Sequence, residues 1–286
     1  MRITVRVPAT SANLGAGFDC FGLALDLCNE VTLDTEAEPG VTWEGEGADE
    51  LPTDGSDLIS RAIATAAGRE GAELSPFRMS AVNRIPLERG LGSSSAAAVA
   101  GVVLGELLAD PSREVDPATV VELVAQIEGH PDNAAACAYG GFTLAVEGGV
   151  VRLDPHPSLR PVVMIPQARS STEASRRALE DRVPREDAVF NLQQSALTVV
   201  AMTQRPDLLS WALRDRLHQR PRLEAVPEVL SVYLELEGAR LPVCLSGAGP
   251  TLIAFESEAH PVPDPGAGWR ALRPGVRALG FEVFAR

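Results

Sequence analysis

A run of glycines and serines in the first half of the sequence constrains this chain more than any other feature. Residues 90–95 read Gly-Leu-Gly-Ser-Ser-Ser, and residues 96–98 are all alanine. Glycines let the backbone bend close to a ligand, and an alanine-rich run is a strong helix former. We therefore expect the serines at a helix N-terminus, where unpaired N–H groups and the helix dipole attract anions. A polyphosphate suits that place. A serine cap on a core helix is the alternative, although three serines and two glycines exceed what a cap needs.

The composition is that of an ordinary folded protein, with 45% hydrophobic and 22% charged residues in a chain of 286. A formal net charge of −14 lacks the basic surface that nucleic acid requires, so no nucleic-acid partner is predicted. The longest apolar stretch, residues 96–108, contains Glu106 and is shorter than the ~20 residues that cross a bilayer, so no membrane partner is predicted. Residues 1–6 lack the apolar core of a secretion signal, which predicts a cytoplasmic protein.

The chain contains no lysine, because every one of the 25 Lys+Arg residues is arginine. A lysine-dependent P-loop, a protein-kinase strand lysine and a Schiff-base lysine are therefore excluded. The four cysteines lie far apart without a C-x-x-C pair, so buried free thiols are expected rather than a zinc site or a disulfide framework.

Alternating apolar and polar residues predict strands over residues 2–7 and 21–35, and the small-residue segment 8–19 between them predicts a surface loop. Residues 154–157 (Asp-Pro-His-Pro) interrupt the pattern, so we expect two domains, residues 1–155 and 156–286. The other expected elements are helices at about 58–67, 93–108, 117–129, 172–182, 187–204, 206–218 and 227–238, and strands before Ile85 and at 141–153 (a hairpin), 161–165, 243–245, 251–255 and 281–284.

A second polar cluster consists of Glu122 followed by Glu128-Gly129-His130-Pro131-Asp132-Asn133. A Mg²⁺ ion that carries a nucleotide needs hard oxygen ligands, and Glu122 together with Ser94 would supply them. The last two residues of the cluster come just after the glycine that ends a helix, where side chains are free to point into a cleft. Asp132 as the N-cap of a short helix is an equally good interpretation, and the sequence leaves both open.

Two further glycine-rich segments attract attention. In Pro8–Asp19 the only side chains with strong polar reach are Asn13 and Asp19, which could contact a ligand. The alternative is an ordinary turn that an Asx hydrogen bond stabilises. The segment Ser246–Thr251 (Ser-Gly-Ala-Gly-Pro-Thr) predicts a tight turn between two strands.

Each segment is weak evidence alone, but their order and spacing along the chain are specific. Together, Pro8–Asp19, Pro86–Ser95, Gly129–Asn133 and Ser246–Thr251 resemble the GHMP kinases, and within them the homoserine kinase family. The resemblance covers nearly the whole chain. It implies an α+β fold of two domains: an N-terminal domain with a mixed sheet and the phosphate loop, and a C-terminal ferredoxin-like domain. It also places ATP in the crevice between them.

The resemblance also implies the activity and the cofactors. The family uses Mg²⁺ and ATP to phosphorylate the side-chain hydroxyl of L-homoserine, on the way to threonine. Mg²⁺ would bind Ser94 and Glu122. Asp57 stands where an asparagine is expected near the nucleotide base, which leaves that contact in doubt. The other nucleotide-binding residues would be Pro86, Leu87, Glu88, Arg89, Gly90, Leu91, Gly92, Ser93, Ser94, Ser95 and Ala96.

L-Homoserine carries an ammonium, a carboxylate and the reacting hydroxyl, so its site needs acids, a bidentate cation and an amide-like group. By the resemblance, the carboxylate would meet Arg176 and Arg222, the ammonium Asp19 and Asp132, and the hydroxyl Asn13 and Asn133, with Thr172 and Gly247 as further substrate contacts.

The residues implied in catalysis are Asn13, Asp132 and Asn133. Relatives such as mevalonate kinase place an aspartate base where Asn133 falls, and an amide cannot take up a proton at neutral pH. We therefore hypothesise catalysis by positioning and charge stabilisation, in which the hydroxyl loses its proton late, to the phosphate itself. Asp132 acting as the base is the alternative.

Two other functions stay open. One is a GHMP kinase for another small alcohol, of the mevalonate type or a sugar, and the other is a catalytically silent paralogue that binds a ligand or partner. Two arginines and two acids favour an amino-acid zwitterion over other alcohols, and the intact serines favour an active enzyme. The sequence also leaves open whether a second copy of the chain is a partner, in a homodimer.

Overall fold

The amino-terminal strand β1 (Arg2–Ala12) lies inside the larger of two sheets. In the computed structural model, which describes residues 1–71, 76–170 and 172–285, β1 pairs antiparallel with the long strand β2 (Phe21–Asp34). Within those residues the sheet has seven strands in the order β11-β1-β2-β4-β3, with β5 and β6 attached beside β2. Among the strands that the structure describes, only β3 and β4 pair in parallel. The remaining strands are β3 (Gly40–Gly45), β4 (Arg78–Asn83), β5 (Phe142–Val146), β6 (Gly149–Leu153) and β11 (Glu282–Ala285).

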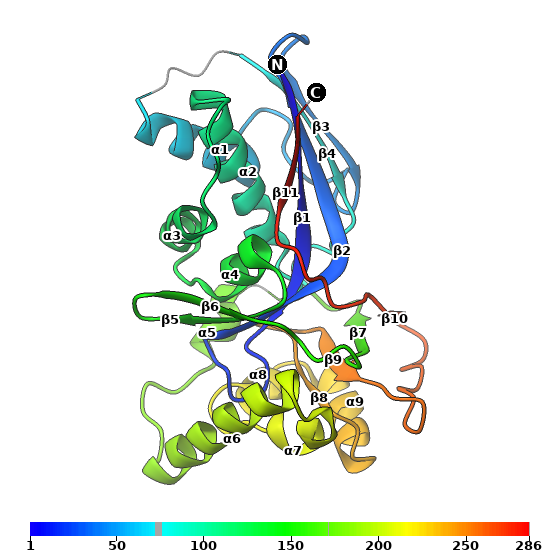
Figure 1. Ribbon diagram of the computed structural model, residues 1–286. Helices are drawn as coiled ribbons and strands as arrows, with labels where there is room; N and C mark the ends of the chain where they lie inside the picture. The colour runs from blue at the N-terminus through cyan, green and yellow to red at the C-terminus, as the bar shows by residue number, and fades with distance from the viewer. Residues whose placement is uncertain (72–75, 171, 286) are drawn as a thin grey trace.

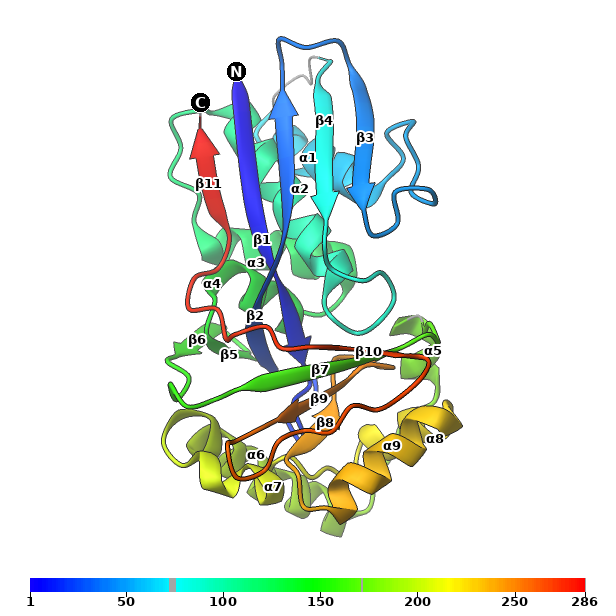
Figure 2. The ribbon, with the colours of Figure 1, turned by 90° about the vertical axis from the view of Figure 1, so that its right-hand side faces the viewer.

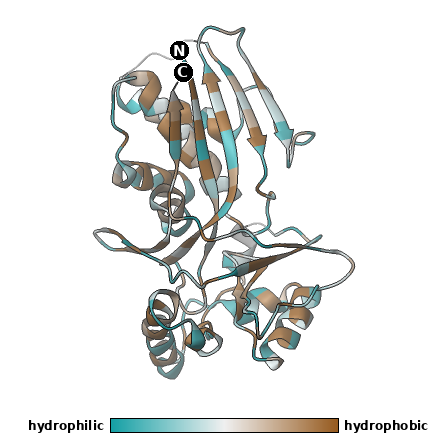
Figure 3. Cartoon of the chain, turned by 45° about the vertical axis from the view of Figure 1, so that its right-hand side comes forward, coloured by the Kyte–Doolittle hydropathy of each residue, from teal (hydrophilic) through white to brown (hydrophobic). Residues whose placement is uncertain are grey.

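Four helices cover one face of this sheet (Figures 1 and 2). They are α1 (Leu58–Arg69), α2 (Ser93–Ala109), α3 (Pro117–Glu128) and α4 (Asp132–Tyr139). The ends of α3 follow ordinary capping rules, because Asp116 accepts from two first-turn N–H groups, Pro117 starts the helix and Gly129 ends it with φ 84°. The uncovered face of the sheet meets solvent, and its strands alternate between hydrophobic and hydrophilic residues (Figure 3).

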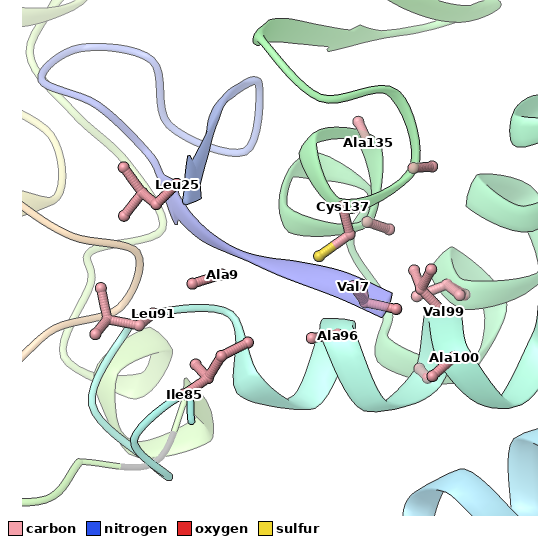
Figure 4. Close-up of a cluster of buried hydrophobic side chains, with 14 of the residues drawn as sticks. Val7, Ala9, Leu25, Ile85, Leu91, Ala96, Val99, Ala100, Ala135 and Cys137 are labelled. Atoms are coloured by element: carbon pink, nitrogen blue, oxygen red, sulfur yellow. The ribbon is translucent and has the colours of Figure 1, made fainter. Parts of the chain in front are cut away.

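The main core lies between this sheet and α2. Figure 4 shows Val7 of β1 beside Val99 of α2 and Cys137 of α4, and all three are completely buried. Helix α2 is apolar on nearly every side and is buried over most of its length. Its first turn, which follows the glycine and serine run, is therefore anchored to the rigid centre of the protein.

The second sheet is antiparallel and has the order β10-β7-β9-β8. Its strands are β7 (Pro161–Pro166), β8 (Val243–Leu245), β9 (Leu252–Phe255) and β10 (Trp269–Leu272). A smaller core, which includes Met164 and Leu252, joins it to the helices beneath. The helices of this half are α5 (Thr172–Arg177), α6 (Arg185–Thr203), α7 (Leu209–Ala212), α8 (Gln219–Glu224) and α9 (Pro227–Gly238), with a 3₁₀ turn, η1, at Pro206–Leu208. No helix in the described part of the chain is long and apolar enough to cross a bilayer.

The structure corrects the expected boundaries in four places. The strand β1 continues to Ala12, into the segment expected to be a loop. The helix expected at 172–182 ends at Arg177, and the one expected at 206–218 stops at Ala212. Asp215 lies in the interrupted part, where its carboxylate accepts from the N–H groups of residues 217, 218 and 219. A side chain that bonds the backbone in this way replaces helical hydrogen bonds.

The fourth correction concerns the domains. The second sheet begins with β7, six residues after the expected boundary at residue 155. The last strand, β11, returns and pairs with β1 in the first sheet (Figure 2). Residues 156–286 are therefore not one continuous unit.

Candidate functional site

The phosphate loop, Gly90–Ser95, ends in the first turn of α2. Gly92 is the N-cap, with φ 69° and without a side-chain hydrogen bond to the helix, so the serine-cap interpretation is wrong. The first intrahelical bond runs from the Ala96 N–H to the Gly92 carbonyl at 2.9 Å. The N–H groups of Ser93, Ser94 and Ser95 are therefore left for a ligand, at the positive end of a 17-residue helix.

The Ser246–Thr251 turn holds the phosphate loop in place. The Ser246 hydroxyl donates to the Gly90 carbonyl at 2.7 Å, and the Thr251 N–H donates to the Arg89 carbonyl at 3.2 Å. Gly90 has φ 75°, and a Cβ atom there would overlap the Ser246 carbonyl oxygen. The turn does join β8 to β9 as expected, but it also clamps a loop that lies more than 150 residues earlier in the sequence.

A cavity of about 230 Å³, the central cavity, opens beside the phosphate loop. It brings together six segments that are distant in the sequence. From the expected site its lining includes Asn13, Glu88, Arg89, Gly90, Gly92, Ser93, Ser94, Ser95, Asp132, Asn133, Arg176, Arg222 and Gly247.

Asp132 and Asn133 form the wall of the central cavity at the start of α4. Pro131 is the N-cap and Asp132 is already the first helical residue, so the N-cap interpretation of Asp132 is wrong. Asp132 Oδ1 lies 2.8 Å from the Asn133 N–H and 3.1 Å from His130 Nδ1. That hydrogen bond raises the pKa of His130. The Thr10 hydroxyl donates to Asn133 Oδ1 at 2.8 Å, which holds the amide in one orientation.

Arg176 lines another wall of the central cavity and pairs with Asp19. Two hydrogen bonds of 2.7 and 3.0 Å join the Arg176 guanidinium to the Asp19 carboxylate. The Asp19 N–H donates to Asn13 Oδ1 at 2.8 Å across six residues, a longer span than an Asx turn bridges. Both Asn13 and Asp19 have positive φ, 58° and 51°. This loop is therefore a specific, strained conformation rather than an ordinary turn.

Arg222 of α8 lines the central cavity and is only 5% exposed. One of its nitrogens lies 3.1 Å from His218 Nδ1 and 3.3 Å from the Gly247 carbonyl. Burial lowers the pKa of Arg222 to about 10, so it stays charged at neutral pH. His218 is fully buried, its Nε2 lies 2.7 Å from the Gly15 carbonyl, and burial lowers its pKa. A neutral His218 that accepts from Arg222 and donates to Gly15 ties this arginine to the loop before Asp19.

Glu122 does not lie at the site, which corrects the predicted magnesium ligand. It is exposed on α3, where the amide of Gln126 is its partner at 3.5 Å. Glu128, six residues later, contacts the Ser95 hydroxyl instead. Residues advance by about 100° each around a helix, so positions six apart face directions about 120° apart. The expected pairing of an acid with the serines is therefore made by the other glutamate of the same helix.

Comparisons with known proteins agree with this geometry. The sequence profile of the GHMP kinases N-terminal domain matches residues 57–141. Homoserine kinase from Streptomyces avermitilis is 42% identical, over 98% of this chain and 95% of that protein, and homoserine kinase from Rhodococcus erythropolis is 41% identical, over 99% and 94%. The chain belongs to the homoserine kinase family.

The crystal structure of homoserine kinase from Cytophaga hutchinsonii has the same fold, with a TM-score of 0.84 at 24% identity, over 99% of this chain and 97% of that one. The expected α+β fold of the GHMP kinases is therefore confirmed. Within this family fold, the phosphate loop lies in the N-terminal part that the profile matches.

Asp57 lies beside a second cavity of about 410 Å³, the Asp57 cavity, which also reaches the phosphate loop at Ser94. Its carboxylate is the N-cap of α1 and accepts from the Ser60 N–H and hydroxyl at 2.9 and 2.6 Å. The apolar side chains of Trp43, Leu51 and Leu58 line the same cavity. Asp57 therefore supports the helix, and the apolar residues supply most of the wall.

Some residues that were predicted to bind the nucleotide or the substrate do not line the central cavity. Ala96 is buried in the main core, Pro86 lines a separate cavity beside β7 and β10, and Leu87 borders the Asp57 cavity. The side chain of Thr172 lies outside the described residues. The residues of the site to which the sequence analysis assigned no role are Thr10, Glu128, His130 and His218. For Glu128 and His130 a signal existed, because they stand four and two positions before Asp132 in one polar cluster.

Proposed function

We propose that this chain is an ATP-dependent kinase that transfers the γ-phosphate to the side-chain hydroxyl of L-homoserine and forms O-phospho-L-homoserine for threonine biosynthesis in the cytoplasm. One observation carries the proposal: the phosphate loop borders the same cavity as Asp132, Arg176 and Arg222, and Asp19 pairs with this Arg176, so the two acids and two arginines that an amino-acid zwitterion needs lie together. The names of the relatives at 41–42% identity agree with it.

The nucleotide spans two cavities in this proposal. The base lies in the Asp57 cavity against Trp43, Leu51 and Leu58, and the triphosphate lies on the N–H groups of the phosphate loop. Ser94 lines both the Asp57 cavity and the central cavity, so a nucleotide that enters from the first presents its terminal phosphate to the second. The N-terminal sheet carries the nucleotide, and the second half of the chain contributes Arg176 and Arg222.

The residues around Ser94 fit a magnesium ion. Glu128 contacts the Ser95 hydroxyl, and both Ser94 and Glu128 line one further cavity between α1 and α3. Carboxylate and hydroxyl oxygens are hard ligands of the kind that Mg²⁺ selects, usually together with phosphate oxygens and water. Bound Mg²⁺ neutralises part of the phosphate charge. Ser94 and Glu128 are the proposed ligands.

The acceptor would bind at the other end of the central cavity. Asp132 Oδ1 is engaged by His130 and Asn133, so its second oxygen would receive the ammonium together with Asp19, whose carboxylate pairs with Arg176. Arg222 is charged and held in place, and it would bind the carboxylate together with Arg176. Arg176 already pairs with Asp19, so these two side chains would present one plus and one minus charge to a zwitterion side by side.

In the reaction the homoserine hydroxyl oxygen forms a bond to the γ-phosphorus, and the bond from that phosphorus to the β–γ bridging oxygen breaks, with ADP as the leaving group. The Asn133 amide, held by Thr10, orients the hydroxyl but cannot take its proton. The proton passes late to the transferred phosphate. Rate then comes from positioning and from charge stabilisation by the loop N–H groups.

Asp132 as a general base is the competing mechanism, and one variant separates the two. Asp132→Asn removes the base and weakens the ammonium contact, so a binding role predicts a KM for homoserine about 10-fold higher with kcat nearly unchanged. A base role predicts instead that kcat falls by at least about 100-fold.

A panel of small alcohols with Mg-ATP tests the function itself. Phosphate transfer to L-homoserine, followed with radiolabelled ATP, should exceed transfer to mevalonate or galactose by orders of magnitude. Faster transfer to another alcohol would contradict the proposed substrate. No transfer to any of them would favour a silent ligand-binding relative.

A further inference from the structure

A kinase without lysine has no ammonium group to offset the negative charge of the triphosphate at its phosphate loop. The triphosphate of ATP carries roughly three to four negative charges, and one Mg²⁺ ion offsets two of them. Related phosphate sites often add a lysine, but this chain has none. If a side chain offsets the remaining phosphate charge, it must therefore be an arginine near the phosphate loop.

Three cavities meet at Ser94: the central cavity, the Asp57 cavity and a cavity of about 640 Å³ between α1 and α3, the α1–α3 cavity. Within the described chain, five arginines line them. Four of these are already engaged. Arg89 donates to the carbonyls of residues 166 and 167, Arg169 donates twice to Glu50, Arg176 pairs with Asp19, and Arg222 bonds His218 and Gly247.

Arg61 is the fifth. Its guanidinium makes no hydrogen bond or ion pair with any residue that the structure describes, and the side chain is exposed. It stands in the first turn of α1, four residues after the N-cap Asp57, and lines the α1–α3 cavity beside Ser94 and Glu128. Helix α1 packs along α2 (Figure 1), and Ile59 and Ala62 of its first turns meet Gly101, about two helical turns beyond Ser94.

The path of the nucleotide leads past this residue. Leu58 lines both the Asp57 cavity and the α1–α3 cavity, and it precedes Arg61 by three positions on the same helix. Residues three apart on a helix are neighbours on one face. A nucleotide with its base beside Leu58 and its phosphates at Ser94 therefore has Arg61 along its outer edge.

We propose that Arg61 binds the terminal phosphate of ATP and takes the role of the missing lysine. This rests on the proposed function and adds a residue to its nucleotide site. The guanidinium matches a phosphate with two parallel N–H groups, and it gives up no protein partner when the nucleotide binds. The other four arginines already use part of their N–H groups on protein partners.

Binding of Mg-ATP and Mg-ADP to the full chain tests this, measured by calorimetry for the unchanged protein, Arg61→Gln and Arg61→Lys. Arg61→Gln should bind Mg-ATP about 10-fold more weakly, with Mg-ADP changed less than 2-fold, and Arg61→Lys should recover part of the loss. Arg69→Gln, at the other end of α1, is the matched control and should bind both nucleotides normally. Retained Mg-ADP binding shows that each variant is folded.

The proposal is overturned if Arg61→Gln binds Mg-ATP normally, or if it loses affinity for Mg-ADP as strongly as for Mg-ATP. The failure of the proposed function looks different: the unchanged protein would then show no binding of either nucleotide.

Discussion

The phosphate loop and the acceptor end of the site border each other but are built in opposite ways. The acceptor end consists of Asp132, Arg176 and Arg222, which line the central cavity, and of Asp19, which pairs with Arg176. The loop consists of consecutive residues and offers backbone N–H groups at the start of a buried helix. The acceptor end takes one charged side chain from each of four segments, and each depends on partners elsewhere.

The difference shows what determines the ligand that each end binds. Backbone N–H groups bind any polyphosphate, so the loop is general, and its precision comes from two glycines and the Ser246–Thr251 clamp. Charged side chains recognise one arrangement of ammonium and carboxylate, so the acceptor end is specific. Changes to the loop should therefore affect catalysis and folding, whereas changes to the acceptor end should affect mainly the KM for the alcohol.

The largest effect is expected for Gly90→Ala, which puts a Cβ atom against the Ser246 carbonyl in a left-handed conformation. We expect a loss of about 2 kcal/mol in the free energy of unfolding and of at least about 100-fold in kcat/KM. Gly148→Ala is the matched control, because it has positive φ but open space around its Cβ position. Denaturant unfolding and kinetics measure both. Equal effects of the two variants would show that the clamp is unimportant.

The next effect separates the two glutamates of α3. Glu128→Gln should lower kcat/KM by about 10- to 100-fold and raise the Mg²⁺ concentration needed for half-maximal rate, because it removes a proposed metal ligand. Glu122→Gln should leave both unchanged, since Glu122 is exposed away from the serines. A magnesium titration of each variant measures this. If the Glu122 variant were the impaired one, the corrected assignment would fail.

At the acceptor end, Arg222→Lys keeps the charge but loses the planar group that meets both His218 and Gly247. We expect the KM for homoserine to rise by about 10-fold, with the KM for ATP unchanged. Steady-state kinetics with each substrate varied in turn provide the test. Parallel increases in both KM values would mean that the two ends are not separable as described.

The smallest effect concerns stability against acid. The pKa of His218 is lowered by burial, so the stability from its neutral form is complete above its unfolded pKa of about 6.5 and is lost as pH falls below it. The pKa of His130 is raised by Asp132, so its contribution is complete below about pH 6.5 and is lost as pH rises through the folded pKa.

Between pH 7 and 5, His218→Gln should therefore lose less unfolding free energy than the unchanged protein, and His130→Gln should lose more. Urea unfolding at the two pH values measures the difference. Changes of the same sign in both variants would contradict these opposite environments.

Much of the fold was predictable because local patterns survive tertiary packing. The period-two strands and the caps of α3 lie where the sequence places them. The return of β11 to the first sheet was not predictable, because a short apolar strand carries no mark of its partner. The end of the helix at Ala212 was not predictable for a different reason, because the Asp215 carboxylate replaces helical hydrogen bonds only once its neighbours are in position.

By itself the sequence determined where α2 begins, because glycines, serines and alanines act on the backbone within a few residues, and it excluded lysine chemistry, because it contains no lysine. The tertiary structure decided which glutamate meets the serines, what clamps Gly90, and how His218 ties Arg222 to the loop near Asp19. The physical reason is distance along the chain. These contacts join segments 33 to more than 200 residues apart, and only packing reveals which face of each helix turns inward.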